Sequence, residues 1–322
     1  MPELISFIVK QMKINSVILV FILFTGLNIS CSRKIVKPPE FDGGRAMSYL
    51  KRQVSFGPRV PGSEASKNCR NYFYNFFDSL QVSYDSNSFS FKDPYSNNNI
   101  PLVNILVTMP GKEATSKKII LVAHYDSRPR TDFTESAEKK NSPIEGANDG
   151  ASGVAVLMEL AVLLNKNKPD VAVELLFVDG EDWGKSGDSD YYLLGSKEFA
   201  KTINADNYYF GIVLDMIGDK DQQVYREEYS ERFAREINDI VWEAAARLSV
   251  NTFHNSVKYA VQDDHLPLNI AGVRTIDLID FDYPYWHTEF DTADKCSAES
   301  LENIGKVLLE LIYNRASWLK KI

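Results

Sequence analysis

Five short apolar runs constrain the fold of this chain more than any other feature of its sequence. Each run is rich in β-branched residues and bounded by turn residues, which is typical of strands buried on both faces of a parallel sheet. The predicted strands are residues 104–109, 118–125, 172–179, 209–218 and 273–280. Helical patterns lie at residues 42–56, 64–80, 153–167, 196–203, 231–249 and 298–318. This alternation predicts an α/β three-layer sandwich, in which helices flank a central, mixed but mostly parallel sheet.

The composition supplies a large core and argues against a nucleic-acid partner. Of the 322 residues, 44% are hydrophobic, and the net charge is −8 with histidine neutral. A nucleic-acid-binding chain usually carries a basic stripe instead. The three cysteines are too few for a disulfide framework. Cys69 and Cys296 could pair in an oxidising compartment, or they could stay as buried thiols.

The first 31 residues are similar to a bacterial lipoprotein signal. Lys10 and Lys13 precede an apolar run that is shorter than the roughly 20 residues a spanning helix needs. The run ends at Cys31, the residue that such signals lipidate. An uncleaved amphipathic anchor and a plain signal peptide with an unmodified cysteine are the alternatives. The predicted organisation is a signal at residues 1–31, a polar tether at 32–41 and one globular domain at 42–322.

Acids and histidines follow the predicted strands one after another. Each alone has an ordinary explanation, such as a helix cap or a solvated loop. Together they point to a site, because sites in such sheets form beyond the carboxyl ends of the strands. Oxygen and imidazole ligands without cysteine suit zinc with an open catalytic position. The residues are His124 and Asp126, Asp149, Glu181 and Asp182, Asp215, Asp263 to His265, and Trp286 with His287.

Several short motifs together resemble the M28 zinc aminopeptidase fold family. They are HYDS at 124–127, GANDGASG at 146–153, DGED at 179–182, LDMIG at 214–218 and WHT at 286–288. Within that family, HYDSR, QDDHLP and YWHT are similar to the glutaminyl cyclases, and the likeness covers residues 43–320. The resemblance implies a zinc-exopeptidase-like fold and one catalytic domain over residues 42–322. It also implies conversion of the N-terminal glutamine of peptides to pyroglutamate, with release of ammonia.

The resemblance assigns roles to single residues. Asp182 stands where animal cyclases have a glutamate ligand, and Asp277 stands where they have a histidine, which leaves the role of Asp277 open. We expect Glu181 to need a raised pKa as general acid and base, which the charges of Asp215 and Asp263 would supply. The implied set is one zinc on Asp149, Asp182 and His287, catalysis by Glu181 with Asp215 and Asp263, and substrate binding by Trp286 and Trp183.

An aminopeptidase with two zinc ions is the main alternative. Asp149 would bridge the metals, His124 and Asp215 would hold the second one, and Glu181 would activate a water molecule. All of these residues are present, so the ligands alone do not separate the two functions. A zinc-free binding lipoprotein is a third reading, and the intact Glu181 argues against it because a binding shell needs no acid or base.

The resemblance also implies where the protein acts and on what. We expect export, as a periplasmic or outer-membrane lipoprotein of a Gram-negative, Bacteroidetes-like bacterium. The expected partners are peptides or proteins with N-terminal glutamine and, through the lipid anchor alone, a membrane. We expect no nucleic-acid partner and favour a monomer.

Overall fold

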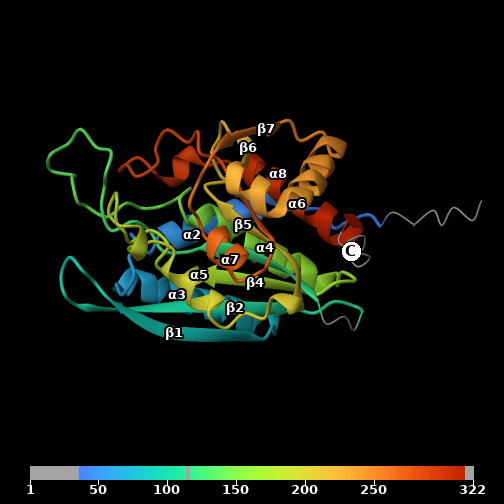
Figure 1. The fold of residues 1–322 in the computed structure, drawn as a ribbon, viewed down its shortest axis with the longest axis horizontal. Helices are drawn as coiled ribbons and strands as arrows, with labels where there is room; N and C mark the ends of the chain where they lie inside the picture. Colours follow the sequence, from blue (N-terminus) through green and yellow to red (C-terminus); the bar gives the residue numbers. More distant parts are fainter. Residues whose placement is uncertain (1–35, 114–116, 316–322) are drawn as a thin grey trace, which may run out of the picture. The chain divides into compact units, whose positions relative to one another are not determined.

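A six-stranded mixed sheet forms the centre of the fold in a computed structural model, which describes residues 36–113 and 117–315. The strands run in the order β1-β2-β4-β3-β5-β8 (Figure 1). β1 and β2 pair antiparallel, as do β2 and β4, whereas β4, β3, β5 and β8 pair parallel along the sheet. Their bounds are β1 (Tyr84–Lys92), β2 (Asn99–Met109), β3 (Lys118–His124), β4 (Val173–Val178), β5 (Tyr208–Asp215) and β8 (Thr275–Ile279). The predicted mixed, mostly parallel sheet is confirmed.

Helices cover both faces of this sheet, because alternate strand residues are apolar in both directions. Ile119 and Leu121 belong to a large core with α2 (Gly43–Val54), α3 (Glu64–Leu80), α4 (Ala151–Lys166), α6 (Glu228–Arg247) and α8 (Ala298–Glu310). Ile120 and Val122, on the opposite face, pack in a smaller core against α5 (Leu194–Ala200) and α7 (His265–Ile270). Short helical turns lie at η1 (Ser189–Tyr191), η2 (Ala205–Asn207), η3 (Ala293–Lys295) and η4 (Leu311–Arg315). The three layers are those expected.

Three strands escaped the sequence analysis. β1 has the polar sequence YDSNSFSFK and a mostly exposed edge position, so no apolar run marks it. β6 (Val224–Glu227) and β7 (Phe253–Tyr259) form a separate two-stranded parallel sheet. The predicted strand at 104–109 also begins earlier, at Asn99. These strands belong to the periphery and leave the predicted centre unchanged.

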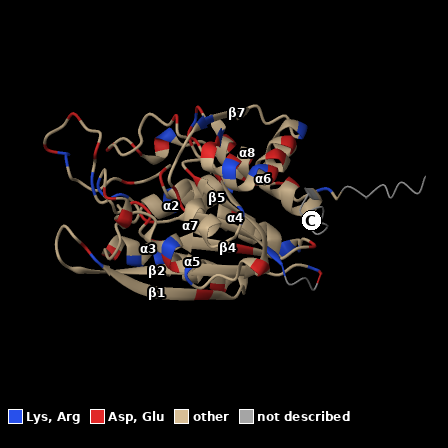
Figure 2. Cartoon of the chain, in the orientation of Figure 1, with Lys and Arg blue, Asp and Glu red and all other residues tan. Residues whose placement is uncertain are grey.

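Cys69 and Cys296 are both buried and free, so the thiol alternative holds in the structure. The predicted lipoprotein signal and the first four residues of the predicted tether, 32–35, lie outside the described residues. Among the helices that the structure does describe, none has both the length and the apolar character required to cross a bilayer. Basic and acidic residues are interspersed over the helices (Figure 2), so the electrostatics of any site must come from its near neighbours.

Candidate metal centre and active site

The carboxyl edge of the sheet collects the residues that the sequence analysis singled out. His124 ends β3 and Asp215 ends β5, while Glu181 and Asp182 follow the end of β4. Asp149 lies two residues before the start of α4. Parallel strands end at one edge, so residues far apart in sequence meet there.

Two groups of possible metal ligands share Asp149. Asp149, Asp182 and His287 form the first group, and His124, Asp149 and Asp215 form the second. Within each group the ligand atoms lie within 4.8 Å of one another, and all five residues are buried. The structure therefore brings together the three ligands expected for one zinc, and also the two further residues expected for a second.

The first group fits a cation because it leaves carboxylate oxygens unpaired. Nε2 of His287 lies 3.4 Å from Oδ1 of Asp182 and 3.7 Å from Oδ2 of Asp149. Asp149 Oδ2 and Asp182 Oδ2 are buried, and no described residue donates a hydrogen bond to either. Such oxygens are costly to bury unless a cation or a donor meets them. Two carboxylates and one imidazole are a ligand set that zinc accepts.

Arg128 and Asp132 hold two ligands of the first group in place. Arg128 is buried, and its guanidinium contacts the carboxylate of Asp182 and, 3.2 Å away, the main-chain oxygen of the same residue. It also pairs with Asp132, whose carboxylate lies 3.3 Å from Nδ1 of His287. Burial opposes a charged imidazole, but Asp182 and Asp132 outweigh it and raise the pKa of His287 to about 9.

His287 has an unusual backbone that this loop stabilises. Its φ is 55°, in the left-handed region that disfavours residues other than glycine. The amides of Asp132 and Phe133 donate to its main-chain oxygen at 3.1 and 3.2 Å. The Asp132–Phe133 segment therefore fixes both the ring and the backbone of this ligand. The sequence analysis did not predict these supports, although Arg128 stood within the HYDSR motif.

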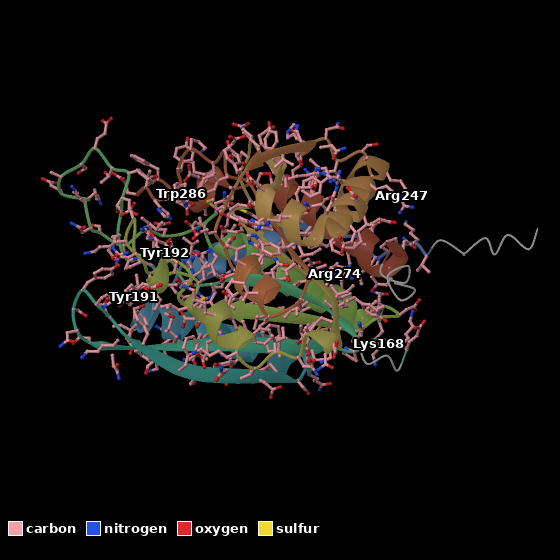
Figure 3. All side chains as sticks on the ribbon, in the orientation of Figure 1. Lys168, Tyr191, Tyr192, Arg247, Arg274 and Trp286 are labelled. Carbon is pink, nitrogen blue, oxygen red and sulfur yellow. The ribbon has the colours of Figure 1, made fainter. Side chains whose placement is uncertain are left out.

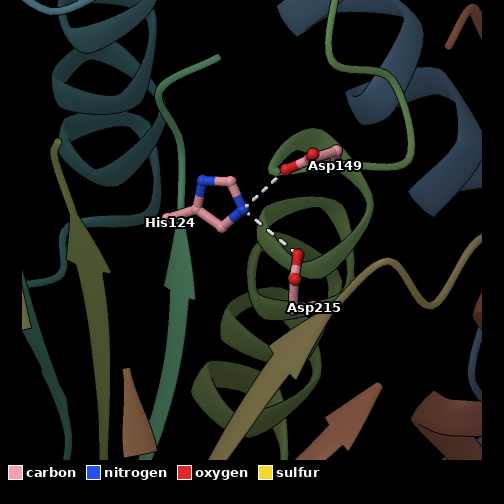
Figure 4. Close-up of side chains that lie close together, drawn as sticks. All are labelled: His124, Asp149 and Asp215. Atoms are coloured by element: carbon pink, nitrogen blue, oxygen red, sulfur yellow. Dashed lines mark hydrogen bonds and ion pairs between the residues drawn. The ribbon is translucent and has the colours of Figure 1, made fainter. Parts of the chain in front are cut away.

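In the second group, the histidine contacts both carboxylates directly. Nε2 of His124 lies 3.1 Å from Oδ1 of Asp215 and 3.2 Å from Oδ1 of Asp149 (Figure 4). Burial opposes the charged imidazole, but its contacts with Asp126, Asp149 and Asp215 raise the pKa of His124 well above its ordinary value. The same contacts pair one oxygen of each of the two acids in this group.

A tight loop presents Asp149 to both groups. Gly150 has a φ of +97°, and a Cβ there would lie 2.5 Å from the main-chain oxygen of Asp126. The buried carboxylate of Asp291 accepts from the amide of Asn148 at 2.8 Å and from that of Asp149 at 3.2 Å. Only glycine fits the position after Asp149, because any side chain would push the loop away from β3.

Glu181 faces the cavity from a segment that Asp126 anchors. The amides of Glu181 and Asp182 donate to the two carboxylate oxygens of Asp126 at 3.1 and 3.3 Å. Burial first, and then the charges of Asp182, Asp263 and Asp264, raise the pKa of Glu181 well above its ordinary value, while His124 opposes the rise. The raised pKa was expected. Its largest cause is burial rather than the expected charges of Asp215 and Asp263.

Asp215 and Asp263 both line the same small cavity as Glu181. Burial raises the pKa of Asp215 to about 7, with His124 opposing and Asp263 adding to the rise. Asp277 is fully buried on β8. Burial and then the charges of Asp263, Asp215 and Glu227 raise its pKa well above the ordinary value. Asp277 lines neither site cavity, so in this structure it can act only through its neighbours.

Two connected cavities open over the first group. The inner one has a volume of about 80 Å³ and is lined by Asp149, Glu181, Asp182, His287 and Trp286, among others. The outer one, about 680 Å³, forms the mouth, and Tyr192 and Trp286 line it (Figure 3). The ring of Trp286 lies 4.0 Å from that of His287 and 5.4 Å from that of Phe133, between ring centroids. An aromatic wall therefore stands beside the ligand His287.

Trp183 does not join this wall. Its indole nitrogen donates to Asp93 at 2.9 Å, and its ring packs against Phe91 at 5.3 Å. It is buried and lines neither cavity of the site. Among the described residues, the expected second tryptophan of the substrate pocket thus occupies a packing position. Phe133 and Phe281 take its place around the mouth, and no spacing in the sequence marked them.

Comparisons with known proteins identify the family to which the chain belongs. Residues 104–312, well over half of the chain, match the model of peptidase family M28. A glutaminyl cyclase from Bacteroides thetaiotaomicron is 34% identical, with a TM-score of 0.82 over 87% of this chain and all of that one. A leucine aminopeptidase precursor from the same species is 35% identical, with the same TM-score and coverage. Bovine glutaminyl-peptide cyclotransferase is 24% identical in an alignment 287 positions long, which covers 78% of this chain and 76% of the bovine protein. The resemblance read from the motifs is confirmed, and the chain belongs to peptidase family M28.

Proposed function

We propose that the chain is a zinc-dependent glutaminyl cyclase, which converts the N-terminal glutamine of peptides to pyroglutamate and releases ammonia. The observation that carries this proposal is the inner cavity. It places the partly buried Glu181 beside the group of Asp149, Asp182 and His287, under the ring of Trp286. The likeness to the Bacteroides glutaminyl cyclase over the whole of its length supports it.

The chemistry needs a polarised carbonyl and a group that moves protons. Zinc held by Asp149, Asp182 and His287 would supply a Lewis acid for the γ-carbonyl oxygen of the glutamine. Glu181 takes a proton from the attacking α-amine and delivers a proton to the leaving amide nitrogen. The bond between the α-nitrogen and the γ-carbon forms as ammonia departs. A carboxyl with a raised pKa suits this exchange, because it holds a proton more readily than an ordinary glutamate and can pass it to the leaving nitrogen.

The remaining residues orient the substrate and keep water away. Trp286 and Phe281 give the cavity an apolar side, against which the methylene groups of glutamine can pack. Water would compete by hydrolysing the amide, so a small cavity with an aromatic wall favours cyclisation. Asp263 and Asp215 line the same cavity, and the charge of Asp263 adds to the raised pKa of Glu181, which favours its protonated form.

We propose that one zinc ion is used and that it occupies the first group. The first group leaves Asp149 Oδ2 and Asp182 Oδ2 without a partner. In the second group, His124 already contacts one oxygen of each carboxylate at hydrogen-bonding distance. Cyclisation uses no external nucleophile, so it does not require a second metal to activate water.

Aminopeptidase activity with two zinc ions is the second candidate. The second group has ligand atoms as close together as the first, within 4.8 Å. The Bacteroides leucine aminopeptidase precursor is as similar to this chain as the cyclase. A water molecule between two metals, with Glu181 as base, would complete such a site.

One paired assay separates the two functions. The purified, zinc-loaded chain is given a glutamine-initiated peptide, with ammonia release measured, and a panel of aminoacyl amides, with release of the free amine measured. Zinc content is determined on the same sample. Ammonia release with one zinc per chain supports the cyclase. Release of amines with two zinc ions per chain contradicts it and supports the aminopeptidase.

We also propose that the protein is exported as a lipoprotein through Cys31 and acts in the periplasm or at the outer membrane. The basic residues, apolar run and cysteine of residues 1–31 support this proposal. Metabolic labelling with a fatty-acid probe in a Gram-negative host tests it. The wild-type chain should incorporate the label, and a Cys31→Ser variant should not. Equal labelling of both chains would contradict the proposal.

A further inference from the structure

A third cavity continues from the mouth of the site. It has a volume of about 480 Å³ and lies between α5 and α7, on the smaller-core side of the sheet. Leu193 and Ala200 line it from α5 and its N-terminal side, and Leu266, Pro267 and Ile270 line it from α7. We call this cavity the α5–α7 groove. None of the roles assigned above to the catalytic and ligand residues involves it.

The groove is continuous with the substrate entrance. Ser189, Leu193 and Gln262 line both the groove and the 680 Å³ mouth. Gln262 also lines the inner cavity that holds Glu181. A peptide whose first residue lies in the inner cavity must leave through the mouth, and an extended chain advances about 3.3–3.6 Å per residue. The groove is therefore within reach of the residues that follow the first one.

Two large apolar side chains at the groove and the mouth are exposed to solvent. Ile270 is 82% exposed and Phe133 is 58% exposed, which makes them the two most exposed large apolar side chains among the described residues. Ile270 lines the groove and Phe133 lines the mouth. Exposed apolar side chains on two cavities that share lining residues indicate a binding surface more strongly than scattered ones do.

The two lysines of the groove are already engaged. Nζ of Lys197 donates to the main-chain oxygen of Ser189 at 2.9 Å, and Lys201 pairs with Glu198. Burial lowers the pKa of Lys197. Because both ammonium groups have partners within the chain and Asp190 also lines the groove, an acidic side chain is disfavoured there.

The wall of the groove is joined to the catalytic segment. The amide of Leu193 donates to the main-chain oxygen of Glu181 at 2.8 Å, and that of Leu194 donates to Gly180 at 3.0 Å. Leu193 has a φ of 59°, so its backbone bends sharply where the mouth and the groove meet. A side chain bound in the groove therefore lies at a fixed distance from Glu181.

We propose that the α5–α7 groove is a specificity subsite, which binds an apolar side chain of the peptide substrate beyond its first residue. The proposal rests on the proposed function only in taking glutamine as the first residue. A peptide that places an apolar side chain in the groove would have a lower KM, because apolar surface is removed from water on binding.

The test uses hexapeptides that begin with glutamine and carry one leucine among alanines, at each position from the second to the fifth. We expect one leucine position to raise kcat/KM for ammonia release by about tenfold over the all-alanine peptide. Ile270→Asp should abolish this advantage and leave the all-alanine peptide unaffected. Phe233→Asp is the matched control, because Phe233 is a 40% exposed apolar residue on α6, outside the groove. Ala200→Phe, which fills the groove, is an independent second variant.

The outcomes test the proposed subsite and the proposed cyclase activity separately. The proposal is overturned if no leucine position exceeds alanine, or if the advantage survives in both Ile270→Asp and Ala200→Phe. If no peptide releases ammonia, the proposed function fails. In that case the groove is tested by binding alone. The dissociation constants of the same peptides are measured with the zinc-loaded Glu181→Gln chain. Tighter binding of one leucine peptide that is lost with Ile270→Asp supports the groove, and equal binding of all peptides overturns it.

Discussion

The two ligand groups that share Asp149 contain nearly the same chemistry in different surroundings. Each has two carboxylates and one histidine within the same 4.8 Å. The first group opens to the inner cavity, and Arg128 and Asp132 hold its ligands from behind. The second group places His124 between its own acids, at 3.1 and 3.2 Å. Under the proposed assignment of zinc to the first group, the comparison teaches that the neighbours of the ligands, more than the ligands themselves, separate a metal site from a buried ion pair.

The largest effect should come from His287→Ala. Loss of a ligand should remove zinc from the first group and lower kcat/KM at least about 1,000-fold. Zinc analysis and ammonia release, measured on the same sample, check this. His254→Ala is the control, since His254 contacts Gln223 and stacks on Tyr225, away from both groups. Full zinc content in the His287→Ala chain would mean that the metal lies elsewhere.

Glu181→Gln should separate chemistry from metal binding. We expect kcat to fall about 100- to 10,000-fold, because the proton carrier is lost, while zinc remains at its wild-type content. Steady-state kinetics with zinc analysis measure both quantities. A variant with near-normal kcat would remove Glu181 from the mechanism for either proposed function.

Arg128→Ala should weaken zinc binding without removing a ligand. Supports of this kind contribute about 10- to 100-fold to metal affinity. Competition with a chelator measures the dissociation constant of the metal directly. Arg130→Ala is the matched control, because Arg130 lies in the same loop and bonds to the main-chain oxygens of Trp183 and Gly184 rather than to a ligand. Equal zinc affinities for the two variants would contradict the supporting role of Arg128.

His124→Asn should leave the zinc content at one ion per chain and kcat/KM within about tenfold of wild type. It should lower stability by about 3 kcal/mol or more, because a buried ion-pair partner is removed. Chemical denaturation of the metal-free protein measures the stability. Loss of one of two zinc ions would instead show that the second group is a metal site.

The smallest effects compare the two tryptophans. Trp286→Phe should raise KM several-fold, since Trp286 lines both cavities. Trp183→Phe should leave KM unchanged and cost about 1 kcal/mol of stability, because it loses the hydrogen bond to Asp93. Kinetics and denaturation of both variants check this. A higher KM for Trp183→Phe would show that Trp183 takes part in substrate binding.

The sequence predicted the centre of the fold and the assembly of the site well. Buried parallel strands are marked by apolar runs, and their carboxyl ends meet, so acids and histidines could be placed at one edge of the sheet in advance. The resemblance to the M28 family then singled out Asp149, Asp182 and His287 among them. β1 could not be predicted in this way, because an exposed edge strand needs no apolar run. Motif adjacency misled at Trp183, which follows Asp182 directly but turns toward β1.

The supports of the site were the least predictable part. Arg128 and Asp132 reach their ligands through a loop without regular secondary structure, and no periodicity places such side chains. Asp291 stands 142 residues from the amide of Asp149 that it holds. Such contacts depend on tertiary structure, so single-sequence patterns do not contain them.

The contact of Asp291 with the Asn148–Asp149 loop also sets an order of events during synthesis. The loop emerges from the ribosome early, together with the helix that it precedes, but the carboxylate that fixes it comes nearly 150 residues later, after β8. His287 emerges only four residues before Asp291. A nascent chain therefore carries Asp149 for 138 residues of its synthesis, and Asp182 for 105, before His287 is added. Zinc held by the first group, as proposed above, would meet its full ligand set only late in synthesis, and its binding free energy would then stabilise the folded state.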